Sequence, residues 1–433
     1  MTRHIVLVWV VLALIVGCHE PPAPATAGSI DLENASRYFS EFDDLCREDD
    51  GSLWGVSLCG PFLIVDPPTR MAVSNQADED GVLEPTLGVF TGELPPEVPI
   101  ANTAVEWAGT RWTMVMVWSL SQDRTRRLSL MAHEAFHRIQ PQLDLETFGE
   151  ICAHLDTADG RFWLQMEWNA LQEALSAEGR QRLDAVVDAL AFRAARRARF
   201  PNAAAREVPL EIFEGLAEYT GMRLAGFSDV EVIETVTAKR EQETGLVRSF
   251  AYVSGPLYGF LLDGAGIPWR DRVRPDTDLG VLLARALDLA AVSGESALER
   301  AEAYGGPVLL AAEQERERKR QEQLDIWRAS LIEGPVLIVD LTVVSSGSFD
   351  PGRVFPFDET STVYTTRELI ADWGVLTVTD GAILENDGAG TGRVSLTGAG
   401  PNALAGDGWS LELEDGWEIV EAERPGDKIL RSK

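Results

Sequence analysis

The chain has 433 residues, of which 69 are Asp or Glu and 38 are Lys or Arg, so its formal net charge is −31. Hydrophobic residues make up 45% and charged residues 25% of the chain, a composition that excludes wholesale disorder. Because binding to a polyanion needs a basic surface, this acidity argues against nucleic acid as a partner. It also argues against attachment to anionic lipid through basic patches.

The first residues have the pattern of a secretion signal. Arg3 precedes an apolar run over 5–16, which is too short for a transmembrane helix and has the length of a signal-peptide core. The run ends in Ile-Val-Gly-Cys18, which resembles a bacterial lipobox and implies lipidation of Cys18. An ordinary signal peptide or anchor helix with a coincidental cysteine is the alternative. We expect a signal peptide over 1–17 and a Pro- and Ala-rich tether over 18–29.

The same resemblance implies a location. His19 stands where lipoproteins retained at the inner membrane usually carry an aspartate. We therefore expect a protein of the bacterial cell envelope, held at the outer membrane by the lipid on Cys18. It would face the periplasm or the cell surface.

Three cysteines follow the lipobox. In an oxidising compartment Cys46 and Cys59 can form a disulfide that closes a short loop. Cys152 would then remain unpaired, buried and inert. No pair of cysteines has the close spacing that is usual in a Cys/His metal site.

The remaining chain divides into three stretches of different periodicity. Short apolar runs broken by Gly, Pro and Asp predict strands over 53–65, 71–74, 87–91 and 111–118. Apolar residues at helical spacing then predict helices over 125–140, 162–200 (one or two helices), 208–225, 257–262, 279–291 and 311–332. Beyond Gly334 the strand pattern returns over 336–344, 373–379, 393–397, 409–413 and 417–420. This order predicts an α+β protein with one region over 30–334 and a small all-β module over 335–433.

The most informative segment is His133-Glu134-Ala-Phe-His137, within the helix expected over 125–140. Residues four apart lie above one another on a helix face, so the two imidazoles can bind one cation. Neutral imidazole is a good ligand for Zn²⁺, and a catalytic zinc keeps one position open for water. Glu134 lies on the adjacent flank, where it can take a proton from that water. Two coincidental histidines on a solvated helix face are the alternative.

A zinc site of this kind needs a third protein ligand, and the best candidate is Glu214. Its spacing from Glu211 and Glu218 places the three carboxylates on one face of a predicted helix. Like charges at this spacing repel one another, so burying them needs a cation, unless they form an exposed acidic face. Glu218 would accept a hydrogen bond from the second ring nitrogen of a ligand histidine.

These residues carry a resemblance to the gluzincin group of zinc metallopeptidases. It rests on two motifs, His133-Glu134-x-x-His137 and Glu214-Gly-Leu-Ala-Glu218-Tyr219. The resemblance implies a zincin-like catalytic region with Zn²⁺ as cofactor and a peptide or protein as substrate. It also implies that the strand over 111–118 is the sheet edge that aligns an extended substrate. The whole chain resembles bacterial secreted lipoproteins that carry the same motifs.

The distance between the two motifs departs from the tightest members of that group. A helical insertion over 142–206 separates His137 from Glu214. Glu167 is therefore a rival third ligand, because it is nearer in the sequence and also lies on a predicted helix. The histidine-rich extension of metzincins is absent after His137.

Gluzincin sites usually add a Tyr or His that donates a hydrogen bond to the reaction's oxyanion. The candidates are Tyr219 and Tyr252, which we favour, together with Tyr258 and His154. For each tyrosine, packing in the core is the alternative. The turn at 254–256 predicts the start of a helix, because it contains a proline. Arg223 is a candidate for holding a substrate carboxylate.

The expected function is zinc-dependent peptide-bond hydrolysis by a lipid-anchored envelope protein, with Glu134 as general base. The alternative is a non-catalytic envelope lipoprotein that has a structural or vestigial metal site and binds a partner through its β module. The presence of Glu134 beside intact ligands favours activity, because a structural site would not need it.

Overall fold

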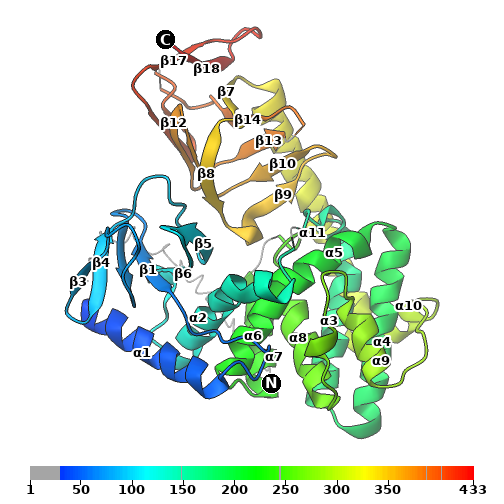
Figure 1. The fold of residues 1–433 in the computed structure, drawn as a ribbon. Coiled ribbons are helices and arrows are strands. Elements are labelled where there is room, and N and C mark those ends of the chain that lie inside the picture. Colours follow the sequence, from blue (N-terminus) through cyan, green and yellow to red (C-terminus); the bar gives the residue numbers. More distant parts are fainter. Residues whose placement is uncertain (1–29, 148, 243–244, 387, 401) are drawn as a thin grey trace, which may run out of the picture.

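The computed structural model of the protein describes residues 30–147, 149–242, 245–386, 388–400 and 402–433. The expected signal peptide, Cys18 and the tether therefore lie outside the described residues. Within the described ranges the chain is α+β, with sheets of six, seven and five strands. Figure 1 shows the six-stranded sheet beside the helices, with the C-terminal β region next to them. None of the described helices is long and apolar enough to span a membrane.

The N-terminal part is a six-stranded sheet with a helix packed against it. Helix α1 spans Leu32–Asp49, and the strands are β1 (Phe62–Asp66), β2 (Met71–Ser74), β3 (Glu84–Thr86), β4 (Val89–Glu93), β5 (Thr103–Trp107) and β6 (Thr110–Met116). Their order is β3-β4-β2-β1-β6-β5, and only β1 and β6 run parallel. The sequence did not predict α1, which Asp31 caps by accepting hydrogen bonds from two backbone N–H groups. The rings of Phe39 and Phe42 pack against Phe62 of β1.

Of the strands expected here, 71–74 is confirmed as β2, and three others need correction. The run over 53–65 is a strand only from Phe62, because glycines with positive φ at 51 and 55 turn the chain before it. The run over 87–91 is divided by the hairpin turn between β3 and β4. The run over 111–118 forms β6, which pairs with β1 on one side and β5 on the other. The free edge of the sheet on this side is therefore β5.

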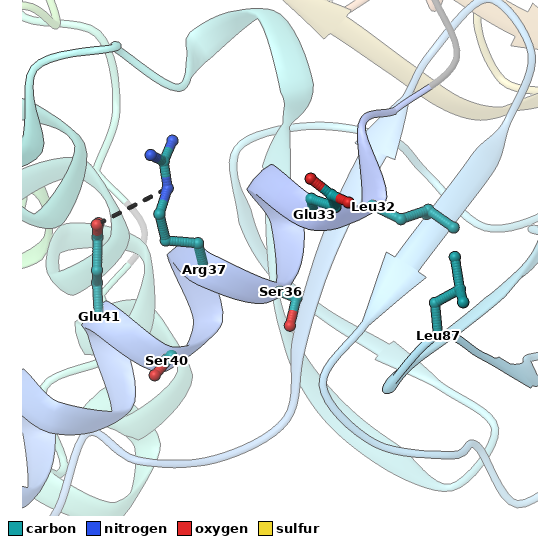
Figure 2. Close-up of a pocket in the computed structure, with 7 residues that line it drawn as sticks. All are labelled: Leu32, Glu33, Ser36, Arg37, Ser40, Glu41 and Leu87. Carbon is teal, nitrogen blue, oxygen red and sulfur yellow. Dashed lines mark ion pairs between the residues drawn. The ribbon is translucent and has the colours of Figure 1, made fainter.

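A shallow hollow of about 420 Å³ lies between α1 and the tip of the β3–β4 hairpin. Figure 2 shows its lining, in which Leu87 at the hairpin tip faces Leu32. Leu87 is 83% exposed. The hollow contains no residue of the histidine motif.

The middle of the chain is helical. Its helices are α2 (Arg124–Ile139), α3 (Ala158–Ser176), α4 (Gly179–Arg199), α5 (Ala203–Leu210), α6 (Leu216–Leu224), α7 (Asp229–Gln242), α8 (Ala251–Gly264), α9 (Leu279–Ala286), α10 (Ala297–Ala301) and α11 (Gly306–Arg328). The helical run over 162–200 is thus two helices, and α7 was not expected. The proline expected to start a helix, Pro256, lies inside α8, where it cannot donate a backbone hydrogen bond to the carbonyl of Tyr252.

Two glycines bring the helices around α6 into close contact. A Cβ at Gly221 of α6 would lie 2.3 Å from the carbonyl oxygen of Ser129 in α2. A Cβ at Gly255 of α8 would lie 2.2 Å from the backbone of Gly215, just before α6. Both distances are shorter than real side chains allow, so only glycine permits these crossings. The segment that contains Glu214 is therefore held between α2 and α8.

The C-terminal part is all-β, which confirms that prediction. Its strands are β7 (Val336–Asp340), β8 (Val344–Phe349), β9 (Val354–Pro356), β10 (Ser361–Tyr364), β11 (Arg367–Ala371), β12 (Gly374–Val378), β13 (Ile383–Asn386), β14 (Thr391–Ser395), β15 (Ala405–Gly406), β16 (Trp409–Leu413), β17 (Trp417–Glu421) and β18 (Lys428–Ser432). They form two sheets, ordered β17-β18-β7-β14-β13-β10-β9 and β15-β16-β12-β11-β8. Side chains of both sheets share one buried core, with Leu337 and Val339 from the first and Leu376 and Leu411 from the second.

Helix α11 joins the helical part to this β module. Its residues Leu324 and Trp327, with Leu331 just beyond it, pack against Val363 and Leu384 of the module. Figure 1 shows α11 beside the module's strands.

Candidate metal centre

Helix α2 presents the histidine motif on its buried side. Asp123 caps its first turn, and Pro141 lies in the turn that follows it. His133, Glu134 and His137 are only 5%, 4% and 4% exposed. The Nε2 atoms of the two imidazoles are 3.2 Å apart, so both rings point into one space.

Glu214 completes this group from the other side. Its Oε2 lies 3.7 Å from Nε2 of His133 and 3.4 Å from Nε2 of His137. Burial alone would raise the pKa of Glu214, but its contacts with the two imidazoles outweigh burial and lower the pKa. Two ring nitrogens and one carboxylate oxygen therefore face one another at short distance.

The second ring nitrogen of His133 has an acidic partner. Its Nδ1 lies 2.9 Å from Oε2 of Glu218, whose Oε1 is 2.9 Å from Nζ of Lys239 in α7. Burial would raise the pKa of Glu218, but the charge of Lys239 and the bond to His133 lower the pKa to about 2. An ionised Glu218 accepts the Nδ1 proton, so Nε2 is the ring nitrogen that faces Glu214, and a metal ion would take the place of the Nε2 proton. Burial lowers the pKa of His133, but the charge of Glu134 and the bonds to the other two glutamates raise it to about 10.

The second ring nitrogen of His137 has an amide partner. Its Nδ1 lies 2.7 Å from Oε1 of Gln140, and Nε2 of Gln140 donates to the carbonyl oxygen of Phe213 at 2.9 Å. Because the amide nitrogen donates to a carbonyl, Oε1 must be the acceptor, so His137 carries its proton on Nδ1. The ring of Phe213 packs on His137 with centroids 4.5 Å apart.

Glu134 is buried beside the histidines, and one of its carboxylate oxygens lacks a hydrogen bond to any described residue. Its Oε2 has no hydrogen-bond partner within the described ranges, and burial raises the pKa of Glu134. The ligand atoms of His133, Glu134 and His137 lie within 4.8 Å of one another, so this buried group can hold a metal ion. A buried polar oxygen without a partner is costly, and a bound water or cation would satisfy it.

The position of Glu214 depends on a break in its helix. The helix expected over 208–225 is divided by a π-turn over Glu211–Gly215, a feature common at functional sites. Glu211 binds Arg193 through both carboxylate oxygens, at 2.8 and 2.5 Å. The expectation that Glu211 shares a face with Glu214 and Glu218 is therefore wrong. Because the turn is wider, the side chain of Glu211 points to Arg193 and not to the histidines.

Tyr252, near the start of α8, is the one oxyanion candidate that the structure brings to the histidines. Its ring stacks on His133 with centroids 5.8 Å apart and planes inclined by 16°. Burial, the charge of Glu214 and a hydrogen bond to that carboxylate raise the pKa of Tyr252 well above its ordinary value. The phenol therefore keeps its proton and remains a hydrogen-bond donor.

Glu167, the rival third ligand, belongs to a different cluster. Its Oε1 binds Arg193 at 2.9 Å and the hydroxyl of Tyr258 at 2.7 Å, and its Oε2 binds Arg196 at 2.5 Å. Both oxygens are thus bound by cations, and the side chain is fully buried. This arrangement removes Glu167 and Tyr258 from the candidates at the histidines.

The other expected site residues are also bonded elsewhere. The hydroxyl of Tyr219 donates to Asp263 at 2.8 Å, and Arg223 lies 3.2 Å from the same carboxylate. His154 binds Glu207 at 2.8 Å. Burial raises the pKa of Tyr219, and its ring is fully buried. Its role is packing, which was the alternative for each tyrosine.

Three residues that contact the histidines or their partners were missed from the sequence, namely Gln140, Phe213 and Lys239. Gln140 is three residues after His137, so the helical spacing alone could have identified it. Lys239 lies in α7, which was not predicted, and no sequence pattern marks it.

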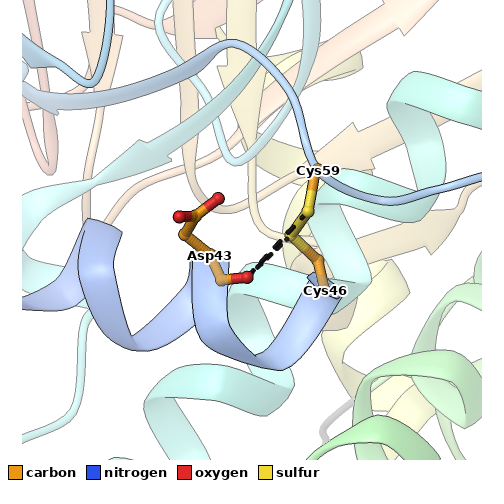
Figure 3. A group of neighbouring side chains, drawn as sticks. All are labelled: Asp43, Cys46 and Cys59. Carbon is orange, nitrogen blue, oxygen red and sulfur yellow. Dashed lines mark hydrogen bonds between the residues drawn. A yellow bond between two sulfur atoms is a disulfide. The ribbon is translucent and has the colours of Figure 1, made fainter. Parts of the chain in front are cut away.

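Asp43, Cys46 and Cys59 also lie close enough together to hold a metal ion, but they do not form a metal site. Cys46 and Cys59 form a disulfide with Cα atoms 5.3 Å apart, beside Asp43 of α1 (Figure 3). Their sulfur atoms are therefore committed to each other and unable to act as thiolate ligands. Cys152 is free and buried, and burial raises its thiol pKa.

The donor set at the histidines fits zinc, since two imidazoles and a carboxylate are the ligands of many catalytic zinc sites. Each ligand histidine also has the partner on its second nitrogen that such sites require. Comparisons with protein-family models, with curated proteins and with solved structures found no match to this chain.

Proposed function

We propose that this protein is a zinc-dependent peptide hydrolase of the gluzincin type, with a zincin-like catalytic region over 30–334. One observation carries the proposal: Nε2 of His133, Nε2 of His137 and Oε2 of Glu214 face one another at 3.2 to 3.7 Å. Glu134 lies beside them with an unbonded carboxylate oxygen. This combination supplies three ligands and a base in one buried space.

The chain's own residues have separate roles in this reaction. When bound, zinc would polarise the substrate carbonyl and lower the pKa of a water molecule. Glu134 takes the proton of the attacking water and delivers it to the leaving amine. Its buried surroundings favour the protonated carboxyl, which suits the second of these transfers. The hydroxyl of Tyr252 donates a hydrogen bond to the oxyanion.

Strand β5 is the candidate surface for the peptide backbone. It is the edge of the six-stranded sheet, and it packs against α2, which carries the histidines. An extended peptide can pair with such an edge through main-chain hydrogen bonds. In this proposal β5 replaces the strand over 111–118 as the substrate-aligning edge.

The first experiment measures metal content. Zinc per mole of purified mature protein is determined by atomic emission for the wild type and for His133→Ala and His137→Ala. His154→Ala is the matched control, since that histidine binds Glu207. We expect one zinc in the wild type and the control and none in the other two variants. Wild-type protein without stoichiometric zinc would sink the proposal.

The second experiment tests catalysis. Glu134→Gln keeps the size of the side chain but removes the base, so hydrolysis of a broad peptide library should fall at least about a hundredfold. Zinc content should stay unchanged. Equal hydrolysis by the variant and the wild type would contradict the catalytic role.

His133, Glu134 and His137 are at most 5% exposed, and this low exposure favours a second candidate function in which the metal site is structural. A structural metal site is closed to solvent, and the protein could then act as an envelope lipoprotein that binds a partner through its β module. The Glu134→Gln experiment separates the two, because a structural site gives no hydrolysis in either protein.

We also propose that the mature chain is anchored by lipid at Cys18, on the lipobox resemblance alone. Metabolic labelling with a fatty acid in bacteria should label the wild type and leave Cys18→Ser unlabelled. Recovery of the label in Cys18→Ser would contradict the anchor.

A further inference from the structure

A second pocket lies where helix α11 meets the β module. It has a volume of about 590 Å³ and is lined by α11, by Asp156 and Arg161 of the helical part, and by residues of the module. Its helix wall is one face of α11, with Arg316, Lys319, Arg320, Gln323, Leu324 and Trp327. None of the residues that line it belongs to the metal centre.

The lining of this pocket is rich in cations, although the chain as a whole has a net charge of −31. Its five basic residues are Arg161, Arg316, Lys319, Arg320 and Arg353. Two of them are neutralised within the protein, since Arg161 binds Glu313 at 2.5 Å and Arg320 binds Glu317 at 2.7 Å. Arg316 also has a partner within the protein, so the cations available to a ligand are Lys319 and Arg353.

Two cations of the rim have little or no acidic partner. The side chain of Arg353 is exposed and forms no ion pair with any described residue. Within the described ranges, Glu315 is the only carboxylate that Lys319 reaches, at 3.7 Å, and the side chain of Lys319 is 68% exposed. Lys319 comes from α11 and Arg353 from the module, so the two line the pocket from opposite walls.

The pocket also offers an apolar surface. The rings of Trp327 and Phe355 lie 5.3 Å apart and both line it. The apolar atoms of a ligand would be removed from water against these rings.

We propose that this pocket binds a small organic anion with one carboxylate or phosphate group between Lys319 and Arg353. The apolar part of the ligand, an aromatic ring or a chain of similar size, packs on Trp327 and Phe355. Asp380 and Asp407 also line the pocket, and their charges select against ligands with many negative groups.

The experiment measures binding of defined probes to the mature chain by isothermal titration calorimetry at low ionic strength. The probes are phenyl phosphate, benzoate, inorganic phosphate and the uncharged benzyl alcohol. We expect saturable one-to-one binding of at least one aromatic anion, weaker binding of inorganic phosphate and none of benzyl alcohol. Whichever of benzoate and phenyl phosphate binds more tightly shows whether the pocket prefers a carboxylate or a phosphate group.

The double substitution Lys319→Gln and Arg353→Gln should weaken that binding about tenfold or more. Arg318→Gln is the matched control, because Arg318 lies on the same helix but binds Glu315 and Glu322 outside the pocket. All of these side chains are exposed, so the variants should fold, and circular dichroism verifies this.

Three results would overturn the proposal. The first is the absence of saturable binding of both aromatic anions up to about 10 mM. The second is an equal loss of binding in the Arg318→Gln control. The third is an affinity for the tighter aromatic anion that is no greater than the affinity for inorganic phosphate.

Discussion

Gln140 accepts a hydrogen bond from Nδ1 of His137 at 2.7 Å and, through its own amide nitrogen, holds the carbonyl of Phe213 at 2.9 Å. Phe213 directly precedes Glu214 in the chain. One fully buried side chain therefore connects the helix that carries the histidines to the turn that carries the carboxylate.

Substitution of Gln140 should weaken metal binding. Gln140→Met keeps the volume but removes both hydrogen bonds, so we expect zinc affinity to fall about ten- to a hundredfold. Competition titration with a chelator measures this. Gln172→Met, which removes an amide that binds Thr237, is the control and should keep wild-type affinity. An unchanged affinity in Gln140→Met would show that His137 does not need this partner.

The two candidate carboxylates should respond to substitution in opposite ways. Glu214→Gln should lose stoichiometric zinc and keep its fold. Glu167→Gln should keep zinc, but its unfolding free energy should fall by about 3–5 kcal/mol, because Arg193 and Arg196 lose a buried counter-charge. Metal analysis and urea denaturation measure the two effects. If Glu167→Gln instead lost zinc and Glu214→Gln kept it, Glu167 would be the third ligand.

Removal of the Tyr252 hydroxyl should affect turnover and leave metal binding intact. We expect Tyr252→Phe to lower kcat by about a hundredfold with little change in zinc content, because the hydroxyl acts on the developing oxyanion. The control is Tyr219→Phe, whose hydroxyl binds Asp263. It should lose about 1–2 kcal/mol of stability and keep its kcat. Similar kcat values for Tyr252→Phe and the wild type would exclude this role.

Asp156 should make stability depend on pH. Burial raises its pKa from 3.8 to about 6, against the opposing charges of Arg320 and Arg161. A carboxyl with a higher pKa in the folded state binds its proton more tightly there. Its stabilising contribution is therefore complete below about pH 4 and is lost as the pH rises through about 6.

The matched variant is Asp156→Asn, which does not titrate. Between pH 4 and 7 the wild type should lose on the order of 3 kcal/mol of unfolding free energy relative to this variant. Urea denaturation at a series of pH values measures the difference. Parallel pH profiles for the two proteins would contradict the raised pKa.

The disulfide should contribute measurably to stability. Cys46 and Cys59 are 13 residues apart, and closing a loop of that length stabilises a fold by about 3 kcal/mol. Dithiothreitol should lower the stability of the wild type to that of a Cys46→Ala, Cys59→Ala variant. The same reagent should leave the variant unchanged, and an effect of equal size on both proteins would point to another target.

The sequence predicted the elements that depend on local spacing. The helix of His133 and His137 follows from apolar periodicity and a proline stop, and the C-terminal strands follow from alternation between turns. Helix α1 was not predicted, although Tyr38, Phe42 and Cys46 lie at helical spacing. Helix α7 was not predicted because its apolar residues do not gather on one face. Edge and interior strands could not be told apart, since β6 became interior through pairing with β1, which lies far from it in the sequence.

At the metal centre, the residues of a local motif were predictable and those from distant segments were not. Nothing in the sequence distinguishes Tyr252, which lies at His133, from Tyr219, which lies at Asp263. Tyr219 lies on a predicted helix and Tyr252 lies just before one, and both are near a glycine. Their placement depends on the helix crossings, and these become known only with the fold.

The π-turn over Glu211–Gly215 has a consequence for how this segment tolerates change. A π-turn contains one residue more than an ordinary helical turn. Because an ordinary helix turns 100° per residue, removing residue 212 or 213 would leave Glu211 and Glu214 two residues, about 200°, apart. The two carboxylates would then lie on opposite sides of a regular helix. Glu211 at Arg193 and Glu214 at the histidines are both placed by this one wider turn, so a deletion there would move at least one of them from its partners without changing either side chain.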